Sequence, residues 1–275
     1  MSSQTLHIDG DLAAYTKGEI LQIQAVLNSL FFGKKPARAN DKRLALTGGY
    51  PGAGKSSFAY QFERMHRDFI RVDVNDNCLF AIPGYQRDYL GKGPEAAYEK
   101  WRAASNWISQ QATKKALDEG YNLLLVGTAT SPFILDLIKQ AKQKKYSTEL
   151  HGFAAPVEIC LKRNKPENRF SYLEHTGGVS FLLPENHVTE KRPLFDKALP
   201  ALVRNVDRAY MNWNPLNTKA PSLAFRSAAM GEEEDVRVMI CSPSATMAFM
   251  NCAGWKKQPD KPILPVLAYH LGIKL

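Results

Sequence analysis

Residues 49–56 form a glycine-rich segment that ends in lysine and serine. The order Gly49-Tyr50-Pro51-Gly52-Ala53-Gly54-Lys55-Ser56 fits the phosphate-binding pattern G-x-x-x-x-G-K-S/T at every fixed position. The glycines let backbone N–H groups turn inward around a phosphate chain. The lysine adds a positive charge to the β- and γ-phosphates, and the Ser56 hydroxyl is a ligand for magnesium. This loop and the residue after it, Ser57, are therefore predicted to bind a nucleoside triphosphate with Mg2+.

The segments on either side suit this loop. Residues 43–47 are an apolar run that can form a buried strand. Residues 57–65 have helical spacing, with Phe58, Phe62 and Met65 on one side. A loop between a strand and a helix brings the positive N-terminal end of the helix to the phosphates. The alternative is a glycine-rich turn that precedes a lysine by chance, and both flanks count against it.

Strands and helices alternate along most of the chain, which predicts a three-layer α/β fold with a mainly parallel sheet. The expected helices are 11–32, 57–65, 94–118, 132–145, one that starts at 156, and 184–211. The expected strands are 43–47, 69–73, 121–127, 148–155, and two less regular ones at 223–226 and 236–240. Residues 172–183 are rich in glycine and serine and are expected to form a loop.

Composition limits the class of protein. With 44% apolar and 23% charged residues, the chain has globular values, and no apolar run approaches the roughly 18 residues of a membrane span. Four scattered cysteines without metal-ligand spacing, and no signal peptide at the start, favour a soluble cytoplasmic protein. The net charge of +9 favours an anionic partner. Nucleic acid stays possible but is not favoured, because no basic stripe is interleaved with aromatic residues.

Three classes of nucleotide-handling protein share this loop. A regulatory GTPase needs a guanine clamp of the N-K-x-D type, and none follows the third strand. A motor-type ATPase needs a carboxylate at the end of that strand, which instead reads Leu125-Val126-Gly127-Thr128. A small-molecule kinase needs only a positioned acceptor hydroxyl beside the γ-phosphate and a carboxylate that takes its proton. The sequence therefore favours an ATP-dependent phosphotransferase with an alcohol-group acceptor.

The carboxylate of such a kinase is expected at the carboxyl end of the second strand, where ligands bind in open α/β sheets. Asp73 and Asp76 follow that strand. Either aspartate could instead cap a helix or stabilise a turn. Gly127, Thr128 and Thr130 follow the third strand at the same edge, and we expect them to line the acceptor site.

From about residue 22 to about residue 215 the chain resembles the zeta toxin family, the kinases of bacterial toxin–antitoxin pairs. The loop, the segment 120–128 and Asn75-Asp76, which lies seven residues before Pro83, resemble the motifs of the family. The resemblance implies ATP and Mg2+ as cofactors and UDP-N-acetylglucosamine as acceptor. It implies Asp76 rather than Asp73 as the catalytic base. It also implies an antitoxin that covers the nucleotide site and a late helix around 203–213.

The chain departs from the family in the acceptor segment. The family's strand reads Glu-Gly-Thr-x-Arg, whereas this chain has Val126 and Thr130 at the acidic and basic positions. A changed acceptor is one explanation, since some related effectors phosphorylate NAD. Arg163 and Arg169 are the candidates for the lid cation that stabilises the transferring phosphoryl group.

The sequence thus predicts a helical N-terminal extension with a linker (1–42), a P-loop kinase domain (43–215) and a small C-terminal extension of unknown role (216–275). We expect the γ-phosphate of ATP to be transferred to a small nucleotide-bearing acceptor, in the service of a toxin or effector. A polynucleotide or nucleoside kinase and an inactive nucleotide-binding module are the alternatives.

Overall fold

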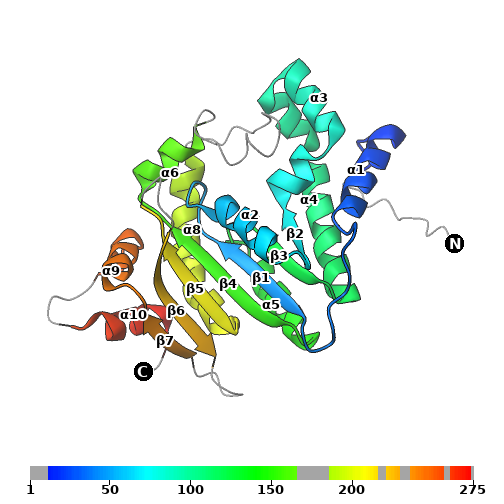
Figure 1. Ribbon diagram of the computed structural model, residues 1–275. Coiled ribbons are helices and arrows are strands. Elements are labelled where there is room, and N and C mark those ends of the chain that lie inside the picture. Colours follow the sequence, from blue (N-terminus) through cyan, green and yellow to red (C-terminus); the bar gives the residue numbers. More distant parts are fainter. Residues whose placement is uncertain (1–11, 166–185, 216–220, 230–235, 257–260, 274–275) are drawn as a thin grey trace.

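The computed structural model describes residues 12–165, 186–215, 221–229, 236–256 and 261–273, which form a central sheet between layers of helices (Figure 1). Seven strands pair in the order β2-β3-β1-β4-β5-β6-β7. Their bounds are β1 Arg43–Gly48, β2 Phe69–Asp73, β3 Asn122–Val126, β4 Ser147–Ala154, β5 Arg208–Trp213, β6 Ser222–Ala229 and β7 Val236–Ile240. The first five strands pair in parallel, and β6 and β7 are antiparallel. The predicted α/β fold with a mainly parallel sheet is confirmed.

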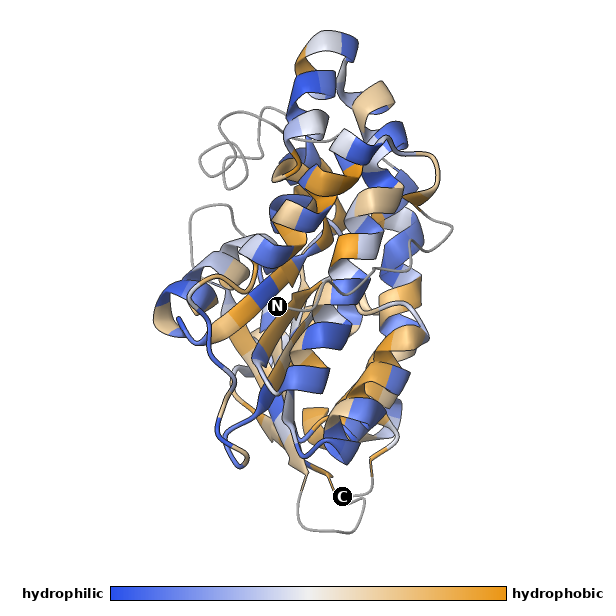
Figure 2. Cartoon of the chain, turned by 90° about the vertical axis from the view of Figure 1, so that its right-hand side faces the viewer, coloured by the Kyte–Doolittle hydropathy of each residue, from blue (hydrophilic) through white to orange (hydrophobic). Residues whose placement is uncertain are grey.

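The central strands are buried on both faces. Along β1, Ala45 packs in a small cluster with Ala59 and Phe62 of α2 (Lys55–Met65), whereas Leu44 and Leu46 belong to the large core. Connections between parallel strands are right-handed. The connection from β1 to β2 crosses the sheet in one direction, and those from β2 to β3, β3 to β4 and β4 to β5 cross it in the other direction. The first connection must therefore lie on the opposite face of the sheet from the other three. Accordingly α2 covers one face, and α4, α5 and α8 pack over the other. Figure 2 shows the apolar strands enclosed by helices of mixed hydropathy.

Most helices begin and end within a few residues of their predicted bounds. Their bounds are α1 Lys17–Ser29, α4 Pro94–Glu119, α5 Phe133–Gln143 and α6 Val157–Asn164. Local chemistry explains the ends: a capping box of Thr16 and Glu19 begins α1, and Gly120, at φ 81°, ends α4. The π-helix η2 Val74–Phe80 and the helix α3 Pro83–Lys92 were not predicted, and neither were the two helices of the C-terminal segment.

The predicted helix 184–211 is wrong in its last part, as is the late helix that the resemblance implied there. The helix α8 spans Asn186–Asn205, and the residues after it form β5. Asp207 explains the break, because its carboxylate accepts hydrogen bonds from the backbone N–H (2.7 Å) and hydroxyl (2.9 Å) of Thr148 at the start of β4. The chain then continues along the open edge of β4, with Ala209 and Met211 buried.

The two strands predicted in the C-terminal segment are confirmed as β6 and β7, and they extend the same sheet. They are followed by α9 (Pro243–Cys252), which packs on β5 and β6, and by α10 (Ile263–Leu271), which packs on α8. Within the described ranges, no helix is both long and apolar enough to cross a bilayer.

Candidate active site

The glycine-rich loop turns between β1 and α2 in a conformation that needs its glycines. Gly49, Gly52 and Gly54 have φ values of 124°, 81° and 112°, in the region that other residues rarely adopt. A Cβ atom on Gly49 would lie 2.2 Å from the carbonyl oxygen of Phe153, so space also excludes a side chain there. The turn delivers the chain directly to Lys55, the first residue of α2.

The side chain of Tyr50 attaches the loop to the residues packed beneath it. Its ring is completely buried, and its hydroxyl accepts a hydrogen bond from the backbone N–H of Ala155 (2.9 Å) and donates one to the carbonyl of the same residue. The hydroxyl also lies 3.3 Å from the Sγ atom of Cys252 in α9. The side chain of Tyr50 therefore holds the loop against the end of β4 and against the C-terminal segment, and only its backbone is available to a phosphate.

Lys55 is half-buried at the floor of the loop. Its Nζ atom donates a hydrogen bond to the carbonyl of Tyr50 at 2.9 Å. Burial lowers the pKa of Lys55 to about 8, and the negative charge of Asp73 opposes that shift. Among the residues that the structure describes, this half-buried ammonium has only a carbonyl as hydrogen-bond partner and is poorly compensated. An anion bound in the loop would restore the solvation that folding removes.

One crevice of about 840 Å³ collects most of the predicted site residues. The loop residues Pro51, Gly52 and Gly54 line it together with Lys55, Ser56 and Ser57. The acceptor segment lines it too, with Gly127, Thr128 and Thr130, and so does Asp73 at the end of β2. The carboxyl ends of three neighbouring parallel strands, β2, β3 and β1, thus open into a single cavity, as ligand sites in such sheets do.

Asp73 is both a cap and a free acceptor. Its Oδ1 atom accepts the backbone N–H groups of Asn75 (2.9 Å) and Asp76 (3.2 Å), which starts η2. Its Oδ2 atom is buried and has no hydrogen-bond partner among the residues that the structure describes. Burial, and next the charge of Asp76, raise the pKa of Asp73. An unpaired carboxylate oxygen of raised proton affinity, on a residue that lines the same crevice as the phosphate loop, suits a general base.

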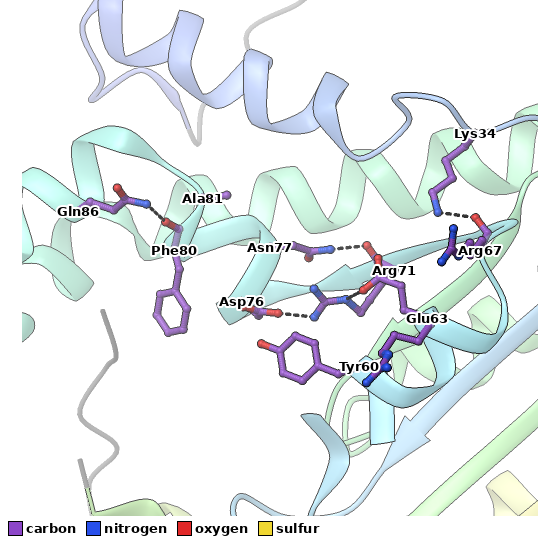
Figure 3. A pocket seen from close by; sticks show the side chains of 11 residues that line it. Lys34, Tyr60, Glu63, Arg67, Arg71, Asp76, Asn77, Phe80, Ala81 and Gln86 are labelled. Atoms are coloured by element: carbon purple, nitrogen blue, oxygen red, sulfur yellow. Dashed lines mark hydrogen bonds and ion pairs between the residues drawn. The ribbon is translucent and has the colours of Figure 1, made fainter. Parts of the chain in front are cut away.

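Asp76 lies on the other side of η2. It forms a buried ion pair with Arg71, whose guanidinium also binds Glu63 at 2.8 Å and lies over the Tyr60 ring at 4.7 Å. Figure 3 shows Asp76 and Arg71 pointing toward each other in a second pocket, of about 750 Å³. No residue that the structure describes lines both cavities. The resemblance favoured Asp76 as the base, whereas the π-helix turns this side chain to Arg71 and leaves Asp73 in the crevice.

The acceptor segment is tied to the phosphate loop. The hydroxyl of Thr47 in β1 accepts the N–H of Gly127 (2.9 Å) and donates to its carbonyl (3.1 Å). The N–H of Gly49 donates to the carbonyl of Thr128 at 3.1 Å. The hydroxyls of Thr128 and Thr130 lie 2.8 Å apart. These hydrogen bonds therefore fix the position of the acceptor segment relative to the phosphate loop.

Arg163 of α6 reaches the loop from the side. Its guanidinium donates to the carbonyl of Gly52 (2.9 Å) and contacts the carbonyl and side-chain oxygens of Asn214 (3.3 Å each). Burial lowers the pKa of Arg163. Arg163 lines the crevice as one candidate for the lid cation, and Arg169, the other candidate, lies outside the described residues.

The sequence analysis missed one wall of the crevice. This wall is a polar stripe on α4, and its residues are Tyr98, Arg102, Asn106, Ser109, Gln110 and Thr113. Most of them are three or four residues apart, which puts them on one side of a helix that buries Trp101 and Ile108 on another. That periodic polar stripe on a long helix was the available signal. His187 and Lys191 of α8 complete the lining.

The sequence profile of the zeta toxin family matches residues 28–176, more than half of the chain. No curated protein matches the sequence.

Two solved structures share the fold. One comes from the PezAT chromosomal toxin–antitoxin system of Streptococcus pneumoniae, with a TM-score of 0.57 and 18% identity over 94% of this chain and 97% of that chain. The other is AvrRxo1-ORF1:-ORF2 with ATP, with a TM-score of 0.52 and 11% identity over 89% of this chain and 71% of that chain. At such identities the likeness establishes a common architecture.

Proposed function

Because this chain belongs to the zeta toxin family, we propose that it is a kinase that transfers the γ-phosphate of ATP to a hydroxyl of a small nucleotide-bearing molecule. One observation carries the proposal: the phosphate loop, a carboxylate with an unpaired oxygen and the acceptor segment line the same crevice. Positioning and charge supply most of the acceleration in phosphoryl transfer, so these few groups are sufficient.

The nucleotide half uses backbone and charge. The N–H groups of the loop would bind the phosphates, and Lys55 would neutralise charge on the β- and γ-phosphates. Ser56 lines the crevice beside Lys55 and would hold Mg2+ through its hydroxyl, an oxygen donor of the kind that this ion prefers. When bound, the ion would supply positive charge that offsets the phosphate charge facing the incoming hydroxyl.

The acceptor half needs a base. We propose Asp73 for this role: its Oδ2 atom would take the proton of the acceptor hydroxyl as the oxygen forms its bond to the γ-phosphorus. The bond between that phosphorus and the β–γ bridging oxygen breaks, and ADP leaves with the electron pair. Gly127, Thr128 and Thr130 would hold the acceptor, and Arg163 or Arg169 would stabilise the transferring group. Asp76 would act through position, by fixing η2 against Arg71.

The acceptor remains one of two kinds within this proposal, UDP-N-acetylglucosamine or a dinucleotide such as NAD. The cellular role would be that of a cytoplasmic toxin or effector, restrained by an antitoxin that covers the nucleotide site. The similar fold from a toxin–antitoxin system supports a protein partner of this kind.

The proposal is tested by following label from ATP into a panel of acceptors. The protein is incubated with magnesium and ATP labelled at the γ-position, together with UDP-N-acetylglucosamine, NAD or oligonucleotides. We expect label in one small nucleotide-bearing product. ATP labelled at the α-position is the matched control and should leave every acceptor unlabelled. Label on oligonucleotide ends would favour a polynucleotide kinase, and binding of ATP without transfer to any acceptor would contradict the proposed activity.

A further inference from the structure

Arg102 is a cation in the crevice that has no anionic partner among the residues that the structure describes. It lies on the polar stripe of α4, where its guanidinium donates a 2.9 Å hydrogen bond to the side-chain carbonyl of Asn75 and stacks at 5.4 Å over the Tyr98 ring. No carboxylate forms an ion pair with it in the described ranges. A partly buried guanidinium held by two neutral groups keeps most of its donors for a ligand.

Two other cations of the crevice belong to the nucleotide half. Lys55 donates to the carbonyl of Tyr50, and Arg163 donates to the carbonyl of Gly52, so both are attached to the phosphate loop itself. Arg102 comes from a different element and is attached to Asn75, two residues beyond Asp73. Its position therefore associates it with the base and the acceptor and not with the β- and γ-phosphates.

The acceptor segment of β3 has no cation that could do the same work. Thr130 stands where the family resemblance implies an arginine, and its hydroxyl is engaged with that of Thr128. A guanidinium supplied by α4 would replace the charge that the segment lacks. The planar fork of an arginine is suited to this exchange, because it can bind two oxygens of one phosphate at once.

We propose that Arg102 binds a phosphate group of the acceptor and so determines which acceptors the crevice takes. This inference rests on the proposed kinase function. Through Asn75, whose backbone N–H donates to Asp73 at 2.9 Å, the same contact would set the distance between the acceptor hydroxyl and the base. Arg102 would thus select acceptors that carry phosphate, and phosphate-free sugars or nucleosides would bind poorly.

Calorimetric titration tests the proposal independently of catalysis. The protein is first saturated with magnesium and a non-hydrolysable ATP analogue, which fills the phosphate loop, and is then titrated with UDP-N-acetylglucosamine or with NAD. N-acetylglucosamine and adenosine serve as phosphate-free counterparts. We expect one phosphate-bearing probe to bind, and Arg102→Gln to weaken it by about tenfold to a hundredfold, as the loss of hydrogen bonds to a charged group does. Arg102→Lys should fall between the two.

Lys114→Gln is the matched control, because it removes one charge from the exposed side of the same helix. It should leave every affinity unchanged, and no variant should alter the affinity for the ATP analogue. Equal binding by the wild type and Arg102→Gln, or failure of both phosphate-bearing probes to bind, would overturn the role of Arg102. Binding that depends on Arg102 without transfer of label in the wild type would instead contradict the kinase function and leave the anion site standing.

Discussion

Two aspartates three residues apart have opposite surroundings in this molecule. Asp73 faces the crevice with one oxygen unpaired, and its pKa is raised by burial and by the charge of Asp76. Asp76 is equally buried, but Arg71 neutralises it on the far side of η2. Burial alone therefore does not make a carboxylate reactive. A compensated charge supports the fold, and an uncompensated one beside a phosphate loop is available for chemistry.

The largest effect is expected on the crevice side. Lys55→Met keeps the length of the side chain and removes its charge, so it should lower kcat/KM for ATP on the order of 10²–10³-fold. It should not destabilise the protein, because the half-buried ammonium has only a carbonyl as partner in the described part of the chain. Steady-state kinetics and urea unfolding of the same preparation test both parts. A variant that loses activity together with its cooperative unfolding would not support this assignment.

The next largest effect is expected for the ion pair of Asp76 and Arg71, on the other side of η2. Asp76→Asn leaves the buried Arg71 with Glu63 as its remaining carboxylate, and should lower the free energy of unfolding by about 3 kcal/mol. Glu63→Gln removes the more exposed partner and is the control, with a loss of about 1 kcal/mol or less. Equal losses for the two variants in urea titrations would show that the Asp76 pair has no special weight.

A smaller effect concerns pH. Burial lowers the pKa of Lys55 to about 8, so its charge is lost as the pH rises through that value. The dissociation constant for ATP should therefore increase about tenfold between pH 7 and pH 9. The Lys55→Met variant should bind weakly and without this dependence. Titrations at four or five pH values would settle the point, and a flat wild-type profile would contradict a buried, titrating lysine.

The smallest effect has the opposite sign to a usual core mutation. The folded state raises the pKa of Asp73, so the stability linked to this group is present at low pH and is lost as the pH rises through the folded pKa. At neutral pH, Asp73→Asn should thus stabilise the protein, by about 1 kcal/mol or less. The gain should vanish in unfolding experiments below pH 4. Destabilisation at pH 7 would mean that the cap at the start of η2 outweighs the charge.

The nucleotide half of the site could be predicted from sequence because its chemistry is local. Backbone N–H groups, Lys55 and Ser56 are adjacent in the chain, and the alternation of strands and helices is sufficient to orient them. The acceptor half is assembled from distant segments. The polar stripe of α4 reads as an ordinary amphipathic helix until the sheet brings Arg102 beside Asn75.

The different surroundings of Asp73 and Asp76 could not be predicted from the sequence for a related reason. Asp73 ends β2 and Asp76 lies three residues further on, and only the unusual winding of η2 directs the two side chains to different sides. The end of α8 was missed because Val206 and Ala209 continue the helical spacing of the buried residues before them, whereas the open edge of β4 draws this segment into the sheet.

The central claim is that phosphoryl transfer uses the carboxylate of Asp73 and not that of Asp76. It is tested most directly by rapid-quench measurement of a single turnover of γ-labelled ATP at saturating acceptor, in Asp73→Asn and Asp76→Asn side by side. We predict that Asp73→Asn slows transfer by about 10²–10⁴-fold with ATP affinity preserved, and that folded Asp76→Asn stays within about tenfold of the wild type. The reverse order of the two rates would contradict the account.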